Sequence, residues 1–227
     1  VYGLEVVPVP THAPVQRQAG SDRVFVTARD RWQAVVGRVH ALHQAGRPVL
    51  LGTGSVADSE HVGRLLEEKG LPHQILNARQ DRREAEIIAR AGQPGAITVA
   101  TNMAGRGTDI SLAPGVVECG GLHVLAAVRN EARRVDRQLF GRCGRQGDPG
   151  SYEAMLSLED DLLKKYLPRT LIKTMQRSAR WRVPVPWKAV MRLTQLLVER
   201  HHARQRRNLV QMDQQLKETL AFSGPLE

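Results

Sequence analysis

The sequence predicts an α/β fold with a mainly parallel sheet, followed by an α-helical extension. Between Val24 and about Asp161, short β-branched runs alternate with helix-length amphipathic segments, which is the pattern of βαβ units. Aromatic residues make up only 4% of the chain, as is typical of an aliphatic core. A chain of 227 residues can bury one good core and add a smaller appendage.

Six segments carry strand signals. Ahead of them, the first 22 residues include Pro8, Pro10 and Pro14, and this proline content indicates an extended linker or an edge strand. The predicted strands cover residues 24–28, 48–53, 73–77, 96–102, 121–128 and 153–158.

Three amphipathic helices are predicted between these strands. They cover residues 29–45, the segment after Ser55, and residues 83–91. A glycine follows each of them, and glycine readily adopts the left-handed conformation that ends many helices. We therefore expect the helices to end at Gly46, Gly70 and Gly92.

The character of the chain changes after Asp161, where the strand signals stop. Apolar residues at helical spacing predict one long helix over about residues 186–221. A helix of that length would extend about 50 Å, so we expect it to project from the sheet domain or to lie along a partner. The predicted organisation is an edge segment (1–22), a motor-type α/β domain (23–161) and a basic helical extension (162–227).

The positive charge is concentrated in this extension. The chain has a formal net charge of +10, and 13 of its 33 Lys and Arg residues lie between Lys164 and Asn208, with Glu199 as the one acidic residue there. An ordinary solvated helix face explains this excess as well as an anionic partner does. Nucleic acid, ribosomal RNA and acidic lipid all remain open as partners, because charge alone does not identify what carries the phosphates.

Several classes of protein are disfavoured. No apolar run approaches the roughly 18 residues of a membrane span. Cys119 and Cys143 have no metal-ligand spacing, and we expect no metal site in the chain. The first residues lack the features of a secretory signal, so the expected location is cytoplasmic. We interpret His123, within an apolar strand, as a hydrogen-bonded core residue, and the acidic residues after Leu158 as the start of a helix.

Two glycine-rich loops carry the chemistry: TNMAGRGTDI (101–110) and FGRCGRQGDPG (140–150). Glycine lets the backbone approach a polyphosphate, and arginine supplies a planar fork for phosphate oxygens. We expect both loops at the carboxyl ends of strands, where ligands gather in parallel sheets. The chain has no GxxxxGK[ST] loop, since GRPVLLGT has the glycines without the lysine.

These two facts together favour arginines that reach a nucleotide held by another domain. A guanidinium supplied across an interface can stabilise the charge of a transferring phosphoryl group. The plainer alternative for Arg142 and Arg145 is a solvated loop with an ion pair to Asp136 or Asp148.

A resemblance to a known family rests on long collinear motifs. The runs ITVATNMAGRGTDI, GGLHV, RRVDRQLFGRCGRQGDPG and SLEDDLLKKY closely resemble the SecA preprotein-translocase motor, and the likeness extends over nearly all of residues 1–165. It implies that family's second RecA-like domain, a three-layer α/β fold of the P-loop NTPase superfamily without its own P-loop, followed by part of the helical scaffold. Within it, TNMAGRGTDI is similar to the fifth helicase motif and QLFGRCGRQGD to the sixth.

The resemblance assigns roles to seven residues. Arg142 and Arg145 would reach the phosphates of ATP, and Gln138 would orient these two arginines. Arg106 and Asp109 would couple the binding of the nucleotide to domain closure, and Gly105 and Gly107 would permit the turn of the loop. The chain departs from the family pattern at two places. Where the family usually has Gly-Thr-Glu, this chain has Ala126, Ala127 and Val128, and where the family commonly has a small residue other than cysteine, it has Cys143.

The expected function is therefore the rear half of a SecA-like ATPase that drives protein export. ATP would be shared with an absent Walker A domain that also holds most of the Mg²⁺, so this chain alone would be inactive. By resemblance its partners are that first motor domain, unfolded polypeptide and the membrane translocon, on the cytoplasmic face. Two alternatives are the C-terminal domain of a nucleic-acid helicase and a freestanding, non-enzymatic regulatory half-motor.

Overall fold

The structure, a computed structural model, describes residues 4–76, 84–101, 108–180 and 186–222. Its centre is a sheet in which every described strand pair is parallel, with the order β1-β7-β6-β3-β5-β4 and with β2 also paired to β7. This arrangement confirms the predicted α/β class. The strands are β1 (Arg17–Ala19), β2 (Arg23–Phe25), β3 (Val49–Thr53), β4 (Gln74–Leu76), β5 (Ile97–Thr101), β6 (Leu122–Ala126) and β7 (Gly150–Ser157).

Strand boundaries differ from the prediction mainly at the two ends of the domain. The early segment contains β1 at the sheet edge, paired in register from Arg17 opposite Gly150. The strand predicted over 24–28 ends at Phe25, because Thr27 caps the following helix by accepting a hydrogen bond from the Asp30 amide at 3.1 Å. A threonine in that position satisfies one of the free amides of the first helical turn.

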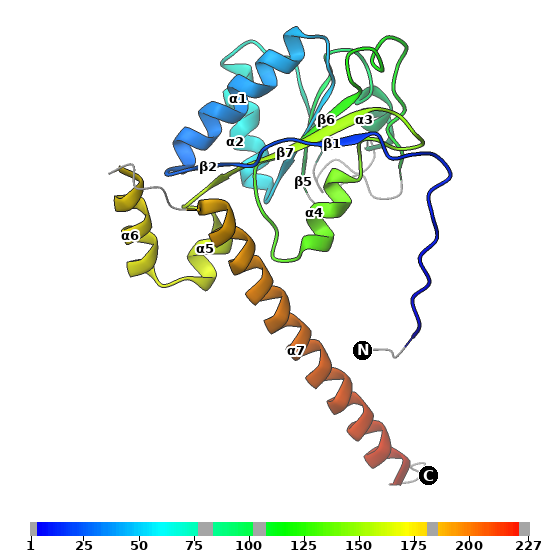
Figure 1. Cartoon of the computed structure of the whole chain (residues 1–227), viewed down its shortest axis with the longest axis vertical. Coiled ribbons are helices and arrows are strands. Elements are labelled where there is room, and N and C mark those ends of the chain that lie inside the picture. The colour runs from blue at the N-terminus through cyan, green and yellow to red at the C-terminus, as the bar shows by residue number, and fades with distance from the viewer. Residues whose placement is uncertain (1–3, 77–83, 102–107, 181–185, 223–227) are drawn as a thin grey trace.

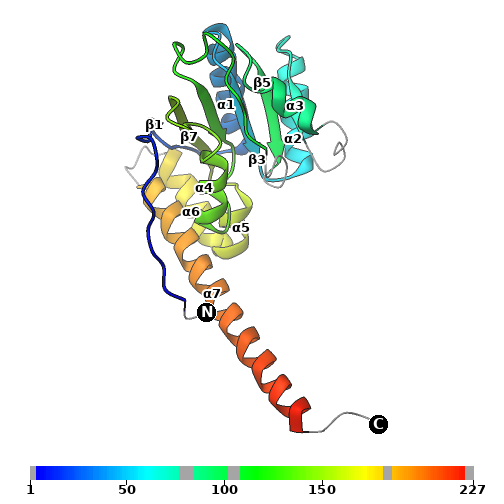
Figure 2. The same ribbon diagram turned by 90° about the vertical axis from the view of Figure 1, so that its right-hand side faces the viewer.

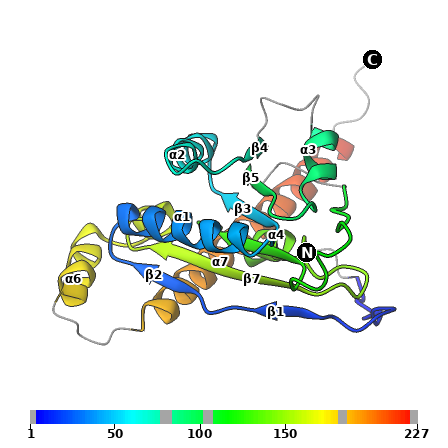
Figure 3. The same cartoon turned by 90° about the horizontal axis from the view of Figure 1, so that it is seen from above.

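One face of the sheet is covered by α1 (Ala28–Gln44) and α2 (Val56–Glu67). Ser55 caps α2, accepting from the Asp58 amide at 3.0 Å. Figure 3 views the sheet from this side, with α1 in front and α7 behind. The core between these layers is aliphatic and includes Val35, Val39, Leu51, Val62, Val99 and Leu125.

The opposite face is covered by α3 (Glu84–Arg90), α4 (Arg133–Phe140) and parts of the C-terminal helices. Because side chains alternate along a strand, Leu50 and Val124 point to this second core while Leu51 and Leu125 point to the first. Two helix layers around a parallel sheet confirm the three-layer fold.

Two of the three expected helix-ending glycines have the left-handed backbone. Gly46 has φ 69° and Gly70 has φ 67°. The third helix, α3 (Glu84–Arg90), does end just before Gly92, but Gly92 does not have the left-handed backbone that was predicted for it. The left-handed residue there is Gly95, at φ 67°. Gly92 serves a close approach instead, since a Cβ on it would collide with the Ser111 carbonyl.

Three helices follow the sheet: α5 (Asp161–Tyr166), α6 (Arg169–Arg180) and α7 (Trp187–Phe222). The 36 residues of α7 confirm the predicted long helix. Figures 1 and 2 show it extending well past the other helices, away from the sheet. Its first turns are anchored, because Met191 and Val198 are each 2% exposed. None of the described helices has the length and apolar character needed to span a bilayer.

The acidic residues after Leu158 do begin a helix, but they do not cap it. Asp160 directs its carboxylate to the Ser157 amide at 2.9 Å and to Arg31 at 2.6 Å. Glu159 accepts from the Ala28 amide at 2.9 Å, at the start of α1. These carboxylates therefore fasten α1 to the end of β7.

Candidate functional site

The arginine loop, residues 141–149, connects α4 to β7. It thus precedes a strand and lies at the amino ends of the parallel strands, beside Gly121 at the start of β6. The expectation that it leaves the carboxyl end of a strand was wrong. The physical reason is α4, which was not among the predicted helices. It returns the chain along the sheet, so the loop that follows it lies at the amino ends of the strands.

The two glycine-rich loops nevertheless meet. The Arg142 guanidinium donates from Nη1 to the Thr108 carbonyl at 2.9 Å. Arg145 Nη1 lies 2.7 Å from Asp109 Oδ1, and Arg145 Nε donates to the Gly141 carbonyl at 2.8 Å. Arg145 therefore pairs with Asp109, rather than with Asp136 or Asp148 as in the plainer alternative.

The cluster of Asp109, Arg142 and Arg145 is partly exposed to solvent. The side chains of Arg145 and Asp109 are 36% and 41% exposed, and Arg142 is half-buried. A hydrogen bond from Arg145 lowers the pKa of the Asp109 carboxyl, despite some opposing burial. Asp109 is consequently a carboxylate at neutral pH, and an incoming anion would compete with it for Arg145.

Arg17 of β1 holds the backbone of the arginine loop. Arg17 donates from Nη1 to the carbonyls of Phe140 and Cys143, both at 3.3 Å. Gly144 has φ 62°, and a Cβ on it would lie 2.6 Å from Arg17 Cβ, so only glycine fits. Burial raises the pKa of the Cys143 thiol to about 11, which makes it a protonated packing residue.

The remaining predicted residues lie apart or outside the description. Gln138 is exposed on α4, ahead of the loop. Gly105, Arg106 and Gly107 fall outside the described residues. The structure thus brings together Asp109, Arg142 and Arg145, with Gln146 added through a 3.1 Å hydrogen bond to Asp109.

His123 is a hydrogen-bonded core residue, as predicted. Its Nδ1 lies 2.7 Å from Ser151 Oγ and its Nε2 lies 3.1 Å from Glu153 Oε1. Burial lowers the pKa of His123, so the ring is neutral near pH 7. Burial opposes the charge of Glu153, but hydrogen bonds from His123 and Arg38 prevail and hold its pKa at about 2.

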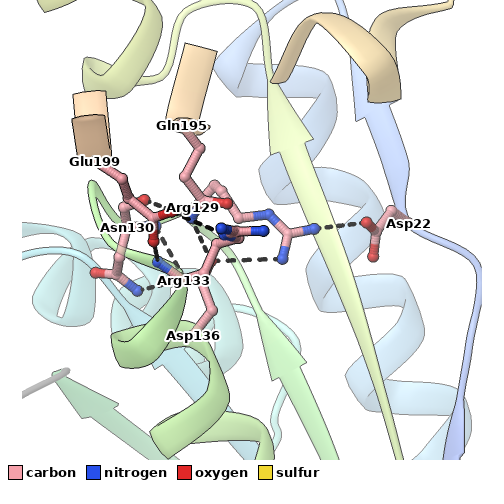
Figure 4. Close-up of polar contacts among 7 residues, drawn as sticks. All are labelled: Asp22, Arg129, Asn130, Arg133, Asp136, Gln195 and Glu199. Atoms are coloured by element: carbon pink, nitrogen blue, oxygen red, sulfur yellow. Dashed lines mark hydrogen bonds and ion pairs between the residues drawn. The ribbon is translucent and has the colours of Figure 1, made fainter. Parts of the chain in front are cut away.

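A polar network between α4 and α7 was not predicted. It gathers around Asp136 of α4, which is 4% exposed, and Figure 4 shows the side chains of α7 reaching it from outside the sheet domain. Sequence reasoning missed it because the partners are about sixty residues apart and follow no local spacing rule. The residues are Asp22, Arg129, Asn130, Arg133, Asp136, Gln195 and Glu199.

Next to this network lies an open groove of about 1270 Å³ between β1, α4 and the start of α7. Its walls combine cationic side chains with apolar and aromatic ones. The cations are Arg129, Arg133, Arg137, Lys188 and Arg192, and the aromatic residues are Phe140, Tyr152 and Trp187.

Comparison with known proteins places the chain in a family. A family model described as the SecA P-loop domain matches residues 14–115 and 113–180. The chain is 46% identical over 226 residues to the protein translocase subunit SecA 2 of Nitrosospira multiformis, covering 99% of this chain and 34% of that protein. It is 54% identical over 164 residues to the protein translocase subunit SecA of Clostridium perfringens, covering 72% of this chain and 20% of that one.

Among solved structures, the yeast DEAD-box splicing factor Prp28 superposes with a TM-score of 0.55 and 17% identity, covering 83% of this chain and 39% of Prp28. Identity this low shows a shared RecA-like fold and no more. The chain spans about a third of the length of the first of these translocase subunits and a fifth of the second. The matched family model covers most of the chain, and the chain therefore belongs to the SecA family.

Proposed function

We propose that this chain is the second motor domain of a SecA-like ATPase that drives protein translocation. In this role it supplies Arg142 and Arg145 to ATP bound at the interface with a first motor domain. The observation that carries the proposal is the meeting of the two glycine-rich loops, which gathers two guanidinium groups at one partly exposed position. Its domains would be the edge segment 1–22, the motor domain 23–161 and the helical extension 162–227.

The donor chemistry fits a triphosphate. Guanidinium forks match phosphate oxygens, and the flexible glycine backbone around Arg142 and Arg145 lets them turn toward a second domain. Asp109 holds Arg145 until a phosphate replaces that carboxylate as its partner. Stabilising the charge of the transferring group in this way contributes on the order of 10³ to 10⁵ in rate.

The other roles follow from the resemblance. Gln138 would orient the arginines, Arg106 and Asp109 would couple nucleotide binding to domain closure, and Gly105 and Gly107 would permit the turn. The first domain would hold most of the Mg²⁺. The whole motor would act on unfolded polypeptide at a membrane translocon, on the cytoplasmic face, since the similar proteins are named as translocase subunits. The basic stretch Lys164–Asn208 would meet an anionic surface of lipid or ribosome.

Complementation tests the proposal. The chain alone should hydrolyse almost no ATP, and adding a first motor domain that carries a GxxxxGK[ST] loop from the same protein should restore turnover. Unfolded polypeptide should stimulate the mixture more than single-stranded RNA does. Turnover by the isolated chain would contradict the division of the site, and stimulation by RNA alone would favour a helicase.

A further inference from the structure

The amino end of α4 depends on α7. Ala132, which precedes the first turn of α4, provides no side-chain cap. Glu199 of α7 supplies the missing acceptor, because its Oε1 accepts from the Arg133 amide at 2.6 Å. Its Oε2 accepts from Arg133 Nε at 2.8 Å. A carboxylate in this place also interacts favourably with the positive end of the helix dipole.

One turn further along, the same two helices share a buried hydrogen-bond cluster. The Gln195 amide group, on a residue only 2% exposed, donates to Asp136 Oδ2 and to the Asn130 carbonyl, both at 2.7 Å. Asp136 also accepts from the backbone amide of Asn130 at 3.0 Å and from its side chain at 2.8 Å. Buried polar groups are costly when unpaired, so this cluster allows one relative position of α4 and α7.

Arg129 extends the cluster to the other end of α4. It forms ion pairs with Asp22 and, at 3.6 Å, with Asp136, and its guanidinium lies 5.9 Å from the Phe140 ring centroid. Phe140 is the last residue of α4 and stacks on Tyr152 of β7 at 4.4 Å. Figure 4 shows Arg129 between Asp22 and the α7 residues.

The arginine loop starts where α4 stops. The amides of Gly141 and Arg142 donate to the Arg137 and Leu139 carbonyls, at 2.8 and 3.0 Å, so the loop begins as a continuation of the helix. The eight residues of α4 span only about 12 Å, so a short helix connects the Glu199 contact at its amino end to the arginine loop at its carboxyl end.

We propose that Gln195 and Glu199 of α7 are positioning residues for Arg142 and Arg145. They hold α4 by its amino end, and α4 carries the arginine loop on its carboxyl end. A displacement of α7 then moves the guanidinium groups of Arg142 and Arg145. In the other direction, binding of these two groups to a phosphate displaces α7. This inference deepens the proposed function and rests on it for the role of the arginines.

Hydrogen exchange on the chain itself tests the hold on α4 without any nucleotide. In Glu199→Ala the α4 amides and those of Gly141 and Arg142 should exchange about fivefold faster, the effect of losing one helix cap, while α1 stays unchanged. Glu199→Gln keeps an oxygen for the Arg133 amide and should restore part of the protection. The matched control is Asp213→Ala, which removes an ion pair with Lys217 on the same helix and does not touch α4.

A second measurement links this hold to the chemistry. Mixed with a first motor domain, Glu199→Ala should lower kcat several-fold with the KM for ATP unchanged, and Glu199→Gln should recover part of the loss. Unchanged exchange across residues 133–149, or an equal rise in α1, would overturn the inference. So would wild-type kcat in Glu199→Ala. If the wild-type mixture itself does not turn over, the proposed function fails, and the exchange result still decides whether α7 positions the loop.

Discussion

The charged side chains of this domain are placed by partners that lie far away in the sequence. Arg145 finds Asp109, 36 positions earlier, and Arg38 of α1 finds Glu153 of β7 at 2.6 Å. The first pair joins two loops, and the second joins α1 to β7. Arg38 and Arg145 are both partly exposed, and the difference lies in the carboxylates, because Glu153 is 9% exposed and Asp109 is 41% exposed. The exposed Arg145–Asp109 pair contributes little to stability.

The enclosed Glu153 carboxylate predicts how stability depends on pH. The pKa of Glu153 in the folded chain, about 2, lies below its ordinary value of 4.5, so its contribution is full above pH 4.5 and is lost as the pH falls toward 2. Burial lowers the pKa of His123 below 6.5, so protonation of this ring in the unfolded chain also favours unfolding below that pH. Both effects have the same sign.

Urea unfolding at pH 7, 5 and 3.5 measures this dependence. Between pH 7 and pH 3.5 we expect the wild type to lose about 1 kcal/mol more of its free energy of unfolding than Glu153→Gln does, because the variant lacks the titrating carboxylate. The curve of the variant should therefore be flatter than that of the wild type in acid. Parallel curves for the two proteins would show that the Glu153 carboxylate is not the group that titrates.

At the scale of elements, the helical extension is divided into an anchored and a free part. Met191, Thr194, Gln195 and Val198 of α7 are buried, while most described side chains after Glu199 are exposed. The apolar side chains of Leu209, Met212 and Leu216 are each at least 60% exposed. The distal half of α7 therefore adds little to the folding of the sheet domain.

Truncation tests this division. A chain ending at residue 205 should keep its free energy of unfolding within about 0.5 kcal/mol, the usual range for changes to exposed surface. Met191→Ala, at the anchored end, should cost about 2 to 5 kcal/mol because it leaves a cavity. Denaturant titration compares the two variants. A large loss of stability on truncation would mean that the distal half packs on the domain.

Residue patterns predicted most elements and missed the relations between them. Periodicity located β3, β5, β6, α1 and α7 to within a few residues, because each is long or strongly patterned. It missed α4, since RRVDRQLF has few apolar residues and begins without a cap of its own. Because the prediction lacked α4, it placed the arginine loop at the carboxyl ends of the strands, whereas the loop lies at their amino ends.

The candidate site shows the same limit. The glycine and arginine pattern pointed to Arg142 and Arg145, the family resemblance added Asp109, and these three residues do lie together. The dependence of α4 on Gln195 and Glu199 had no local signal, because these contacts form only once α7 has packed. The motifs therefore identified residues that meet in the fold, whereas the contacts that support α4 could not be identified from the sequence, and the chemical roles of the three residues stay a prediction.

At the scale of the whole molecule, the fold presents two neighbouring arginines in a chain whose sequence has no GxxxxGK[ST] loop. Two helices, α4 and α7, lie between the arginine loop and the tip of α7. They are joined by the exposed Arg133–Glu199 contact and by the buried hydrogen bond from Gln195 to Asp136. In the proposed function, this arrangement would let the domain close on a nucleotide held by the first motor domain and pass the movement to α7.

The most direct test of this account is the turnover of Arg142→Ala mixed with a first motor domain. We expect kcat to fall by at least about 10³-fold, because the guanidinium acts on the charge of the transferring phosphate. Arg137→Ala, which removes an exposed arginine of α4, is the matched control and should keep kcat within about twofold of the wild type. If Arg142→Ala turns over as fast as this control, the arginine does not reach the nucleotide and the account is wrong.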